Sequence, residues 1–439
     1  MTTLQERYYS LMSALAPARR TVWGPTTSTK DDQYGITSKI VDLIFDQAVL
    51  EGASDVHLEP DAKLLRVRYR IDGALYEVLN IENNPNIPII PRIKVMANLE
   101  TDTMMMRKPQ DGRFTMRIGK EEVDFRVATF PTVLGEKVAI RVLQKNFGLY
   151  RLDRIGFDPF DLSRIAQLIQ NKHGLLLVSG PTGSGKTTTL YAILNQLNSP
   201  RTNIITLEDP VEYQIPGMNQ CDIKKKLDFN FADALRAALR QDPDILLVGE
   251  IRDMETAEIA IRASLTGHLV FTTLHANSAV GTVVRMLNMG IESYLVSYSL
   301  IGTIAQRLVR RICDQCRFAY QLNANEFNRM KMHYKILLDD KTKSTDIFYS
   351  LEKTTEMTFY KGKGCDKCNN TGYKGRLGVF EIIVFDDVFR EAVLRKAPAS
   401  ELHEIALKSG TKPLVMDGLD KARKGLTSLE EVLSIALEK

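Results

Sequence analysis

The chain has 439 residues, of which 44% are hydrophobic and 26% charged, and its formal net charge is +4. This length allows two or three domains with ample cores, and the composition is that of an ordinary globular protein. No apolar run reaches the roughly 18 residues of a membrane-spanning helix, and so small a charge gives no reason to expect nucleic-acid binding. The first 20 residues contain early charges and no uninterrupted apolar core. They are therefore not a secretory signal, and we expect a cytoplasmic protein.

The first third of the chain indicates a short N-terminal segment followed by a mixed domain. Residues 1–35 hold apolar side chains at helical spacing and then a polar linker. We expect the apolar stripe to pack against the chain's own body, docking on a partner being the alternative. Residues 36–145 mix helices and strands, with a helix capped at Thr37 or Ser38, and we interpret them as an α+β domain.

A half-buried strand is predicted over 65–71, because apolar residues alternate there with three arginines. An Asp-Gly pair at 72–73 follows and predicts a hairpin turn. We expect 83–91 to be a turn-rich insert and a helix to cover 93–99. The three arginines are Arg66, Arg68 and Arg70. They are either solvated or in contact with phosphate or with an acidic neighbour.

The pattern changes near residue 161, after a connector over 146–160. Strands now alternate with helices, which predicts a parallel sheet and an α/β domain over 161–439. This domain contains a cysteine-bearing insertion over 310–375 and a helical C-terminal part. The apolar segments expected as strands are 175–178, 203–207, 244–248 and 269–273.

A glycine-rich motif follows the first of these strands. The segment 180–187 fits G-x-x-x-x-G-K-[ST], and glycines let the backbone wrap closely around a phosphate. Lys186 would reach the β- and γ-phosphates, and the Thr187 hydroxyl would ligate Mg²⁺. A chance glycine-rich turn is the alternative, but the flanking strand and helix argue against it. We therefore predict that the following residues bind a nucleotide: Gly180, Pro181, Thr182, Gly183, Ser184, Gly185, Lys186, Thr187 and Thr188.

Carboxylates and histidines follow the other strands. Because ligands bind beyond the carboxyl ends of parallel strands, these side chains should meet the phosphates. Phosphoryl transfer needs a metal, a carboxylate that organises it and a group that orients water. Glu250 stands two residues after its strand, so we expect a metal contact through water, with Glu208 or Glu212 polarising the attacking water. His275 is a candidate γ-phosphate sensor, with His268 just ahead of the same strand, although either histidine is equally compatible with a structural role.

Four of the five cysteines form two C-x-x-C pairs. Four thiolates suit tetrahedral Zn²⁺, although the pairs lie farther apart than in compact zinc ribbons. Disulfides are the alternative, and they are disfavoured because nothing indicates an oxidising compartment. Such a zinc ion would be structural, since no ligand position stays open. The predicted ligands are Cys313, Cys316, Cys365 and Cys368, whereas Cys221 stands alone as a buried or incidental thiol.

Together these segments resemble the bacterial secretion ATPase superfamily, and within it the type II secretion and type IV pilus assembly ATPases. The resemblance covers about residues 36 to 439. Its motifs occur in the family's order, and the paired cysteines belong to the same set. The matching segments are SDVHLEP (54–60), VRYRIDG (67–73), GPTGSGKTT (180–188), LEDPVE (207–212), RQDPD (240–244), GEIRD (249–253) and TGHLVFTTLHAN (266–277).

The resemblance implies a hexameric ring in which a PAS-like N-terminal domain precedes a RecA-like P-loop NTPase domain with a zinc-binding insertion. It also implies that arginines of the N-terminal domain reach the nucleotide phosphates, namely Arg113, Arg126 and Arg141. From the residues alone, Arg126 and Arg141 lie in apolar strands, where a guanidinium needs a partner. Arginines brought in by domain closure would couple hydrolysis to motion.

The implied activity is that of an ATP-hydrolysing motor that uses ATP, Mg²⁺ and Zn²⁺. It would act at the inner face of the bacterial inner membrane, through a platform protein, and would assemble type IV pili or type II secretion pseudopili without binding nucleic acid directly. Pilus retraction, DNA transfer and a nucleotide-gated scaffold with little turnover are the alternatives. The paired cysteines disfavour the first two, and the two carboxylate clusters disfavour the third.

Overall fold

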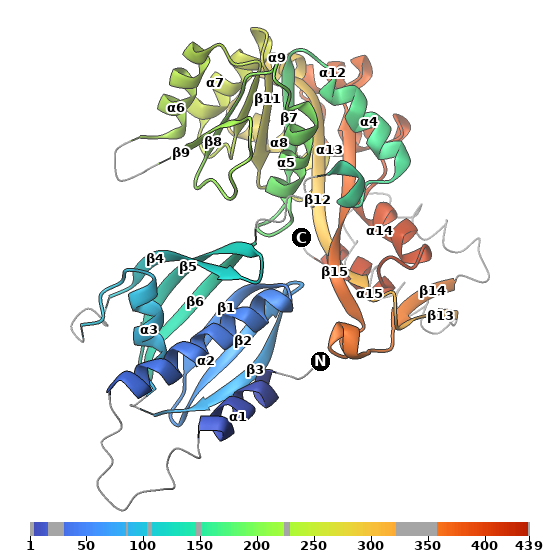
Figure 1. Ribbon diagram of the computed structural model, residues 1–439. Helices are drawn as coiled ribbons and strands as arrows, with labels where there is room; N and C mark the ends of the chain where they lie inside the picture. Colours follow the sequence, from blue (N-terminus) through green and yellow to red (C-terminus); the bar gives the residue numbers. More distant parts are fainter. Residues whose placement is uncertain are drawn as a thin grey trace, which may run out of the picture. The chain divides into compact units, whose positions relative to one another are not determined.

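The structure is a computed structural model that describes residues 4–15, 30–84, 87–102, 108–144, 151–223, 229–321 and 358–437. The chain divides into two compact units, Met1–Asn146 and Phe147–Lys439 (Figure 1). The segment expected as a connector begins the second unit, because Leu152 and Phe157 are buried in that unit's core.

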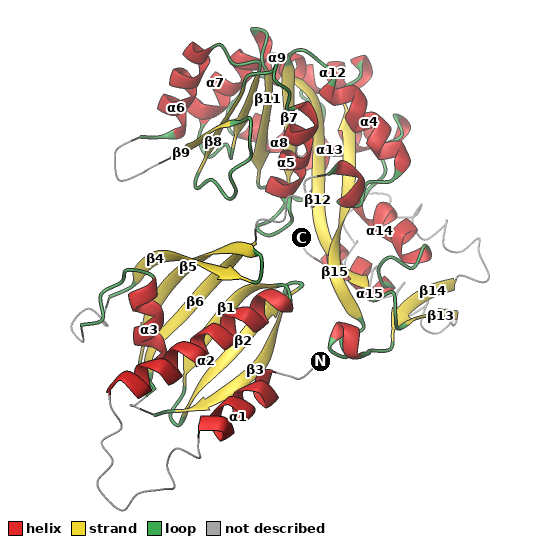
Figure 2. Cartoon of the chain, viewed as in Figure 1, coloured by secondary structure: helices red, strands yellow, loops and turns green. Residues whose placement is uncertain are grey.

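The first unit is a six-stranded antiparallel sheet in the order β3-β2-β1-β6-β5-β4. Helix α2 lies across one face of this sheet (Figure 2). Its Phe45 packs against Phe114 and Phe125, with ring centroids 5.4 and 4.8 Å away. The elements are α1 (Leu4–Leu15), α2 (Lys30–Leu50), β1 (Ala53–Pro60), β2 (Leu64–Ile71), β3 (Ala74–Glu82), α3 (Ile89–Met96), β4 (Gln110–Ile118), β5 (Glu121–Thr132) and β6 (Gly135–Gln144).

The predicted strand and hairpin are both present in the first unit. Asp72 and Gly73 have φ values of 49° and 88°, the left-handed conformations that a tight two-residue hairpin requires. The three arginines of β2 meet acidic neighbours, one of the alternatives left open by the sequence. Their ion pairs are Arg66–Asp61 at 3.5 Å, Arg68–Glu59 at 2.7 Å and Arg70–Asp55 at 3.6 Å.

Two helices begin earlier than expected. Helix α2 starts at Lys30, so the second half of the expected linker is partly helical. Helix α3 starts at Ile89, inside the expected turn-rich insert, with Pro88 as its N-cap. Pro91 lies in the first turn of α3, where a missing N–H breaks no intrahelical bond, so these prolines mark a helix start rather than a turn.

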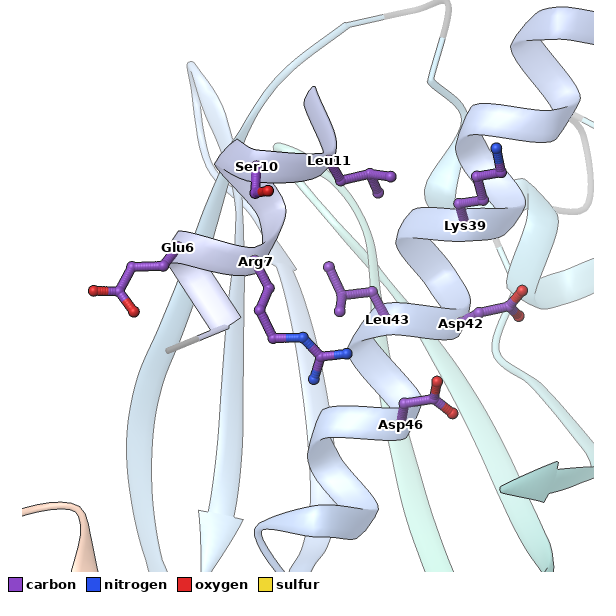
Figure 3. A pocket seen from close by; sticks show the side chains of 8 residues that line it. All are labelled: Glu6, Arg7, Ser10, Leu11, Lys39, Asp42, Leu43 and Asp46. Atoms are coloured by element: carbon purple, nitrogen blue, oxygen red, sulfur yellow. The ribbon is translucent and has the colours of Figure 1, made fainter. Parts of the chain in front are cut away.

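Helix α1 packs against its own unit, as expected. Leu4 and Tyr8 are buried in the core, with two further apolar residues of the stripe packed at its margin. An open groove of about 590 Å³ runs between α1 and α2, and charged side chains dominate its rim (Figure 3). The groove holds none of the predicted site residues, since its lining consists of Glu6, Arg7, Ser10, Leu11, Lys39, Asp42, Leu43 and Asp46.

The second unit is built on a seven-stranded sheet in the order β15-β12-β7-β11-β10-β8-β9. All neighbouring strands are parallel except β15, which pairs antiparallel with β12. The main-sheet elements are α4 (Pro159–Ile169), β7 (Gly174–Ser179), α5 (Lys186–Leu197), β8 (Ile204–Glu208), β9 (Asn219–Asp222), α6 (Phe231–Ala238), β10 (Ile245–Val248), α7 (Met254–Leu265), β11 (Leu269–Leu274), α8 (Ala279–Asn288), α9 (Ser293–Ser299), β12 (Leu300–Ile312) and β15 (Tyr373–Val384).

Besides short 3-10 turns, the other elements described in the second unit are a two-stranded sheet and four C-terminal α-helices. They are β13 (Arg317–Gln321), β14 (Thr358–Gly362), α12 (Asp387–Leu394), α13 (Ala399–Lys408), α14 (Leu414–Arg423) and α15 (Leu429–Leu437). Every residue of β7, β10 and β11 is buried, as the continuous apolar runs predict. Among the described helices, none is long and apolar enough to cross a membrane.

A buried cluster of charges ties α4 to the C-terminal helices. Asp158 accepts a hydrogen bond from the Asp161 backbone N at 2.8 Å and pairs with Lys412 at 2.9 Å. Asp417 pairs with Lys421 inside the same cluster. Asp161 is only 3% exposed. Burial, together with the charges of Asp158 and Asp417, raises the pKa of Asp161 to about 6.

We expect Asp161→Asn to stabilise the chain at alkaline pH. The folded-state pKa lies above the unfolded value, so the wild-type chain is most stable while Asp161 is protonated and loses stability as the pH rises through about 6. The asparagine removes that ionisation and should raise the free energy of unfolding by roughly 1–3 kcal/mol near pH 8 and by much less near pH 4.5. Unfolding followed by circular dichroism measures the difference. The exposed Glu391→Gln on α12 serves as control, and equal destabilisation by Asp161→Asn at both pH values would contradict the assignment.

Candidate nucleotide-binding site

The loop between β7 and α5 has the shape of a phosphate cradle. It leaves β7 at Ser179 and enters α5 at Lys186. Gly183 and Gly185 have φ values of 79° and 87°, which side-chain-bearing residues rarely adopt. Gly185 is also the N-cap of α5, so the first amides of that helix point into the loop. The motif glycines are therefore required by the backbone conformation itself.

The Lys186 side chain lies across this loop. Its Nζ donates to the carbonyl oxygens of Gly180 at 2.9 Å and Pro181 at 3.0 Å. Burial lowers the pKa of Lys186, an effect that the charge of Glu250 opposes. The ammonium group therefore lies inside the cradle, where a bound phosphate would offer it stronger acceptors than carbonyl oxygens do.

Strand register brings the predicted chemistry to one edge of the sheet. Leu274, the last residue of β11, pairs with Ser179, and Val248 pairs with both Thr272 of β11 and Leu207 of β8. The carboxyl ends of four strands thus lie level with one another. Glu208 is the last residue of β8, and the segments that follow β7, β10 and β11 carry the phosphate loop, Glu250 and His275.

Glu250 is the centre of a polar cluster at that edge. Arg252 donates from Nε to Glu250 Oε1 at 2.7 Å and from Nη1 to Asp209 Oδ2 at 3.2 Å. His275 Nε2 lies 3.6 Å from Glu250 Oε2. The structure therefore brings Glu250 and His275 together, and it adds Arg252, whose role the spacing of the motif alone did not indicate.

A glycine precedes Glu250 for a steric reason. A Cβ at Gly249 would lie 3.0 Å from the carbonyl oxygen of Leu207, because β8 and β10 are close neighbours there. The Gly249 N also donates to that oxygen at 2.7 Å. A side chain directly after the strand would push the two backbones apart, so the acidic group stands one position later.

Glu208 has a different environment from the one expected. It is buried, and its carboxylate accepts hydrogen bonds from Tyr191, from Thr206 Oγ1 at 2.6 Å and from Gln220 Nε2 at 3.3 Å. Burial raises the pKa of Glu208. These contacts fasten α5 and β9 to β8 rather than aim the carboxylate at water beside the phosphates. Of the two acids expected to polarise water, Glu212 is the more accessible, because it is only half-buried.

His268 lies at the opposite edge of the sheet from His275. Its Nδ1 is 3.0 Å from the carbonyl oxygen of Ala263, and its own carbonyl accepts from Gly174 at the start of β7. The six residues of β11 separate the two histidines, so their Cα atoms are about 23 Å apart along the strand. Within one chain, the structure does not bring His268 to the phosphate loop, although the sequence places it near the same strand.

The predicted arginines form a row across the sheet of the first unit. Arg113 is paired in register with Arg126, Arg126 with Arg141, Arg141 with Asp55 and Asp55 with Arg70. Arg113 and Arg141 are exposed and Arg126 is half-buried, so the row lies at the surface of the sheet although Arg126 and Arg141 each stand between apolar residues of their strands. Asp55 lies 3.6 Å from Arg141 Nε. Like charges directly opposite one another destabilise a sheet, a cost that a bound anion would offset.

The four paired cysteines converge at the end of β12. Their sulfur atoms all lie within 4.8 Å of one another. The Sγ–Sγ distances are 3.8 Å for Cys313–Cys365, 3.8 Å for Cys316–Cys368 and 3.7 Å for Cys365–Cys368. Disulfide sulfurs would be about 2.05 Å apart, whereas a zinc tetrahedron with Zn–S bonds of about 2.3 Å has edges of about 3.8 Å. The cluster therefore fits a zinc-binding insertion.

The backbone around the second C-x-x-C pair supports these thiolates. The N–H groups of Cys365 and Gly372 both donate to Cys368 Sγ at 3.3 Å. Gly364 and Gly372 have φ values of 91° and 79°, so glycines form the turns on either side of the second cysteine pair. Such N–H donors orient thiolate ligands and stabilise their charge, which completes a site suited to a closed metal centre.

The comparisons with known proteins identify a family. A family model described as type II/IV secretion system protein matches residues 30–434. The chain is 44% identical to type II secretion system ATPase E of Vibrio cholerae over 400 residues, which are 91% of this chain and 75% of that protein. It is 45% identical to the type IV pilus assembly ATPase PilB of Myxococcus xanthus over 396 residues, which are 90% of this chain and 67% of that protein.

Solved structures agree with the fold. The pilus retraction motor PilT with bound ADP matches with a TM-score of 0.61 at 26% identity, covering 90% of this chain and 96% of that one. The ATPase DotB of Legionella pneumophila matches with a TM-score of 0.66 at 19% identity, covering 91% and 96%, and shows the shared fold alone. The predicted α/β fold with its RecA-like P-loop domain is confirmed. The chain therefore belongs to the type II/IV secretion system protein family, as one of its ATPases.

Proposed function

We propose that the chain is an ATP-hydrolysing motor that powers the assembly of type IV pili or type II secretion pseudopili. The observation that carries the proposal is the meeting, at one sheet edge, of the phosphate loop with the Glu250–Arg252–His275 cluster. A loop alone would support binding, whereas a carboxylate held at the same sheet edge by Arg252, with His275 beside it, supports hydrolysis. The named relatives, ATPase E and PilB, support the choice of machinery.

Within this site, each group has a separate task. Lys186 and the first amides of α5 bind the β- and γ-phosphates. Thr187 is exposed on the first turn of α5, and Glu250 is partly exposed after β10, so oxygen ligands suited to Mg²⁺ lie at the same sheet edge. The ion, when bound, supplies positive charge to the phosphates. Glu212 orients the attacking water, and His275 contacts the γ-phosphate.

The arginine row extends the proposal to the first domain. We place a PAS-like domain at 36–145 and the RecA-like motor domain at 161–439. Arg113, Arg126 and Arg141 would reach the nucleotide when the domains close in a homo-hexamer. A bound polyphosphate would offset the repulsion between their positive charges. The ring would act on an inner-membrane platform protein at the cytoplasmic face, without direct contact to nucleic acid.

Pilus retraction is the second candidate function. The structural match to the retraction motor PilT favours it, but that match has only 26% sequence identity. The relatives of higher identity are named for secretion and pilus assembly. We propose that the four-cysteine cluster holds one structural Zn²⁺. The cluster also favours assembly over retraction, because the paired cysteines are part of the resemblance to the assembly ATPases.

We expect Glu250→Gln to retain nucleotide binding and to lose turnover. The amide keeps the shape of the side chain but removes the charge that organises the metal and its water. ATP hydrolysis should fall by about 100-fold or more, while the affinity for ADP with Mg²⁺ stays within about threefold. The control is Glu255→Gln, which removes an exposed carboxylate on α7. Hydrolysis by the Glu250 variant at the wild-type rate would refute the role of this residue.

We expect the purified chain to contain about one zinc ion, because four thiolates form one closed tetrahedral site. Elemental analysis measures the content, and Cys365→Ser should lose most of the metal and lower the thermal unfolding midpoint. Cys221→Ser is the matched control and should keep its zinc. A metal-free preparation with an unchanged unfolding midpoint would show that the cluster is not a zinc site.

A further inference from the structure

Gln306 lies on β12, outside every motif that the sequence singled out. We propose that Gln306 is a positioning residue, whose side-chain amide holds the phosphate loop in the shape that accepts a nucleotide. This inference rests on the proposed nucleotide site and concerns how that site is kept ready for its ligand.

The Gln306 side chain links the phosphate loop to the first turn of α5. It is only 2% exposed. Its Nε2 donates to the carbonyl oxygen of Ser184 at 2.8 Å, and its Oε1 accepts from Thr189 Oγ1 at 2.7 Å. Ser184 precedes Lys186 in the loop, and Thr189 lies in the first turn of α5. One amide therefore holds the loop backbone just before the phosphate-binding lysine and the Thr189 side chain just after it.

Only an amide satisfies both partners without a charge. The carbonyl of Ser184 needs a donor, and the hydroxyl of Thr189 uses an acceptor. A leucine of similar volume offers neither, and it would leave two buried polar groups without their partners. The pairing is thus specific in chemistry and not only in size.

Two motif glycines face Gln306 at close range. A Cβ at Gly180 would lie 2.5 Å from the Gln306 carbonyl oxygen, and a Cβ at Gly185 would lie 2.8 Å from its Nε2. The loop therefore passes so near β12 at both ends that no side chain fits between them. Ala305 pairs in register with Ser179, the last residue of β7, so β12 continues alongside the loop after β7 has ended.

The next residue of β12 fixes a second part of the site. Arg307 is 3% exposed and donates from Nη2 to the carbonyl oxygen and Oδ1 of Asn277, at 3.3 and 3.2 Å. Its Nη1 donates to the Gln306 carbonyl at 3.0 Å. Because Asn277 stands two residues after His275, adjacent positions of one strand hold the phosphate loop and the segment that carries His275. β12 thereby sets the spacing between the two halves of the site.

The test is the affinity of the full chain for ADP with Mg²⁺, measured by calorimetry. A loop that must be ordered on binding costs free energy that a preformed loop does not. Gln306→Leu should therefore weaken ADP binding by about tenfold or more. The matched control is Thr303→Val, a buried residue of the same strand whose hydroxyl bonds to the Ala279 carbonyl oxygen at 3.3 Å, away from the loop. It should bind ADP as the wild type does.

A double-mutant cycle separates positioning from general destabilisation. Thr189→Val removes one arm of the bridge and should weaken ADP binding by about three- to tenfold. Because both residues serve one bridge, the double variant should bind ADP about as weakly as Gln306→Leu alone, whereas independent effects would multiply. Unfolding midpoints without ADP, compared with those of Thr303→Val, report any change in the fold itself.

The outcomes distinguish this inference from the proposed function. If the wild type itself fails to bind ADP, the proposed nucleotide site is wrong. If the wild type binds and a folded Gln306→Leu variant binds equally well, the positioning role is wrong. Should that variant fail to fold, Thr189→Val decides alone, and wild-type affinity in it overturns the inference.

Discussion

The parallel register of β7, β11, β10 and β8 is the constraint on which the second unit depends. Each of these strands is apolar throughout or nearly so, and each is followed directly by polar groups. Because the strands run in one direction and end level with one another, the polar residues at and after their carboxyl ends meet at one edge. The phosphate loop, the Glu250 cluster and His275 are brought to the same edge by this register. Shifting the register of one strand by two residues would move Glu250 about 7 Å along the strand direction relative to Lys186.

The sequence was most informative where a single local pattern decides the structure. Continuous apolar runs predicted the buried strands, the glycine motif predicted the loop, and the paired cysteines predicted one cluster. It was less informative where a distant partner decides. Whether Glu208 points to solvent depends on Tyr191, Thr206 and Gln220, which come from three separate segments. His268 looked like a site residue because it is near His275 in sequence, but an intervening strand carries it to the other edge of the sheet.

Gln306 illustrates the same limit more sharply. Nothing in its neighbourhood on the chain marks it as part of a nucleotide site, because its partners Ser184 and Thr189 lie more than a hundred residues earlier. Pro88 and Pro91 show the opposite case, in which the local signal is strong but has two meanings. Proline favours both turns and the first turn of a helix, and only the burial of Ile89 and Ile93 selects the helix. Local propensity thus narrows the choices, and packing makes the final one.

The two long strands β12 and β15 have a structural consequence. Their antiparallel pairing runs from Gly302 and Val384, in the main sheet, to Ile312 and Tyr373, next to the cysteine cluster (Figure 1). Cys313 N donates to the carbonyl oxygen of Gly372, so the two strands meet beside the cysteine cluster. Gln306 stands midway along this ribbon, about 23 Å from Cys313 at the rise of an extended strand. One continuous hydrogen-bonded ribbon therefore joins the cysteine cluster to the residue that holds the phosphate loop, although the loop and the cluster lie in separate parts of the sequence.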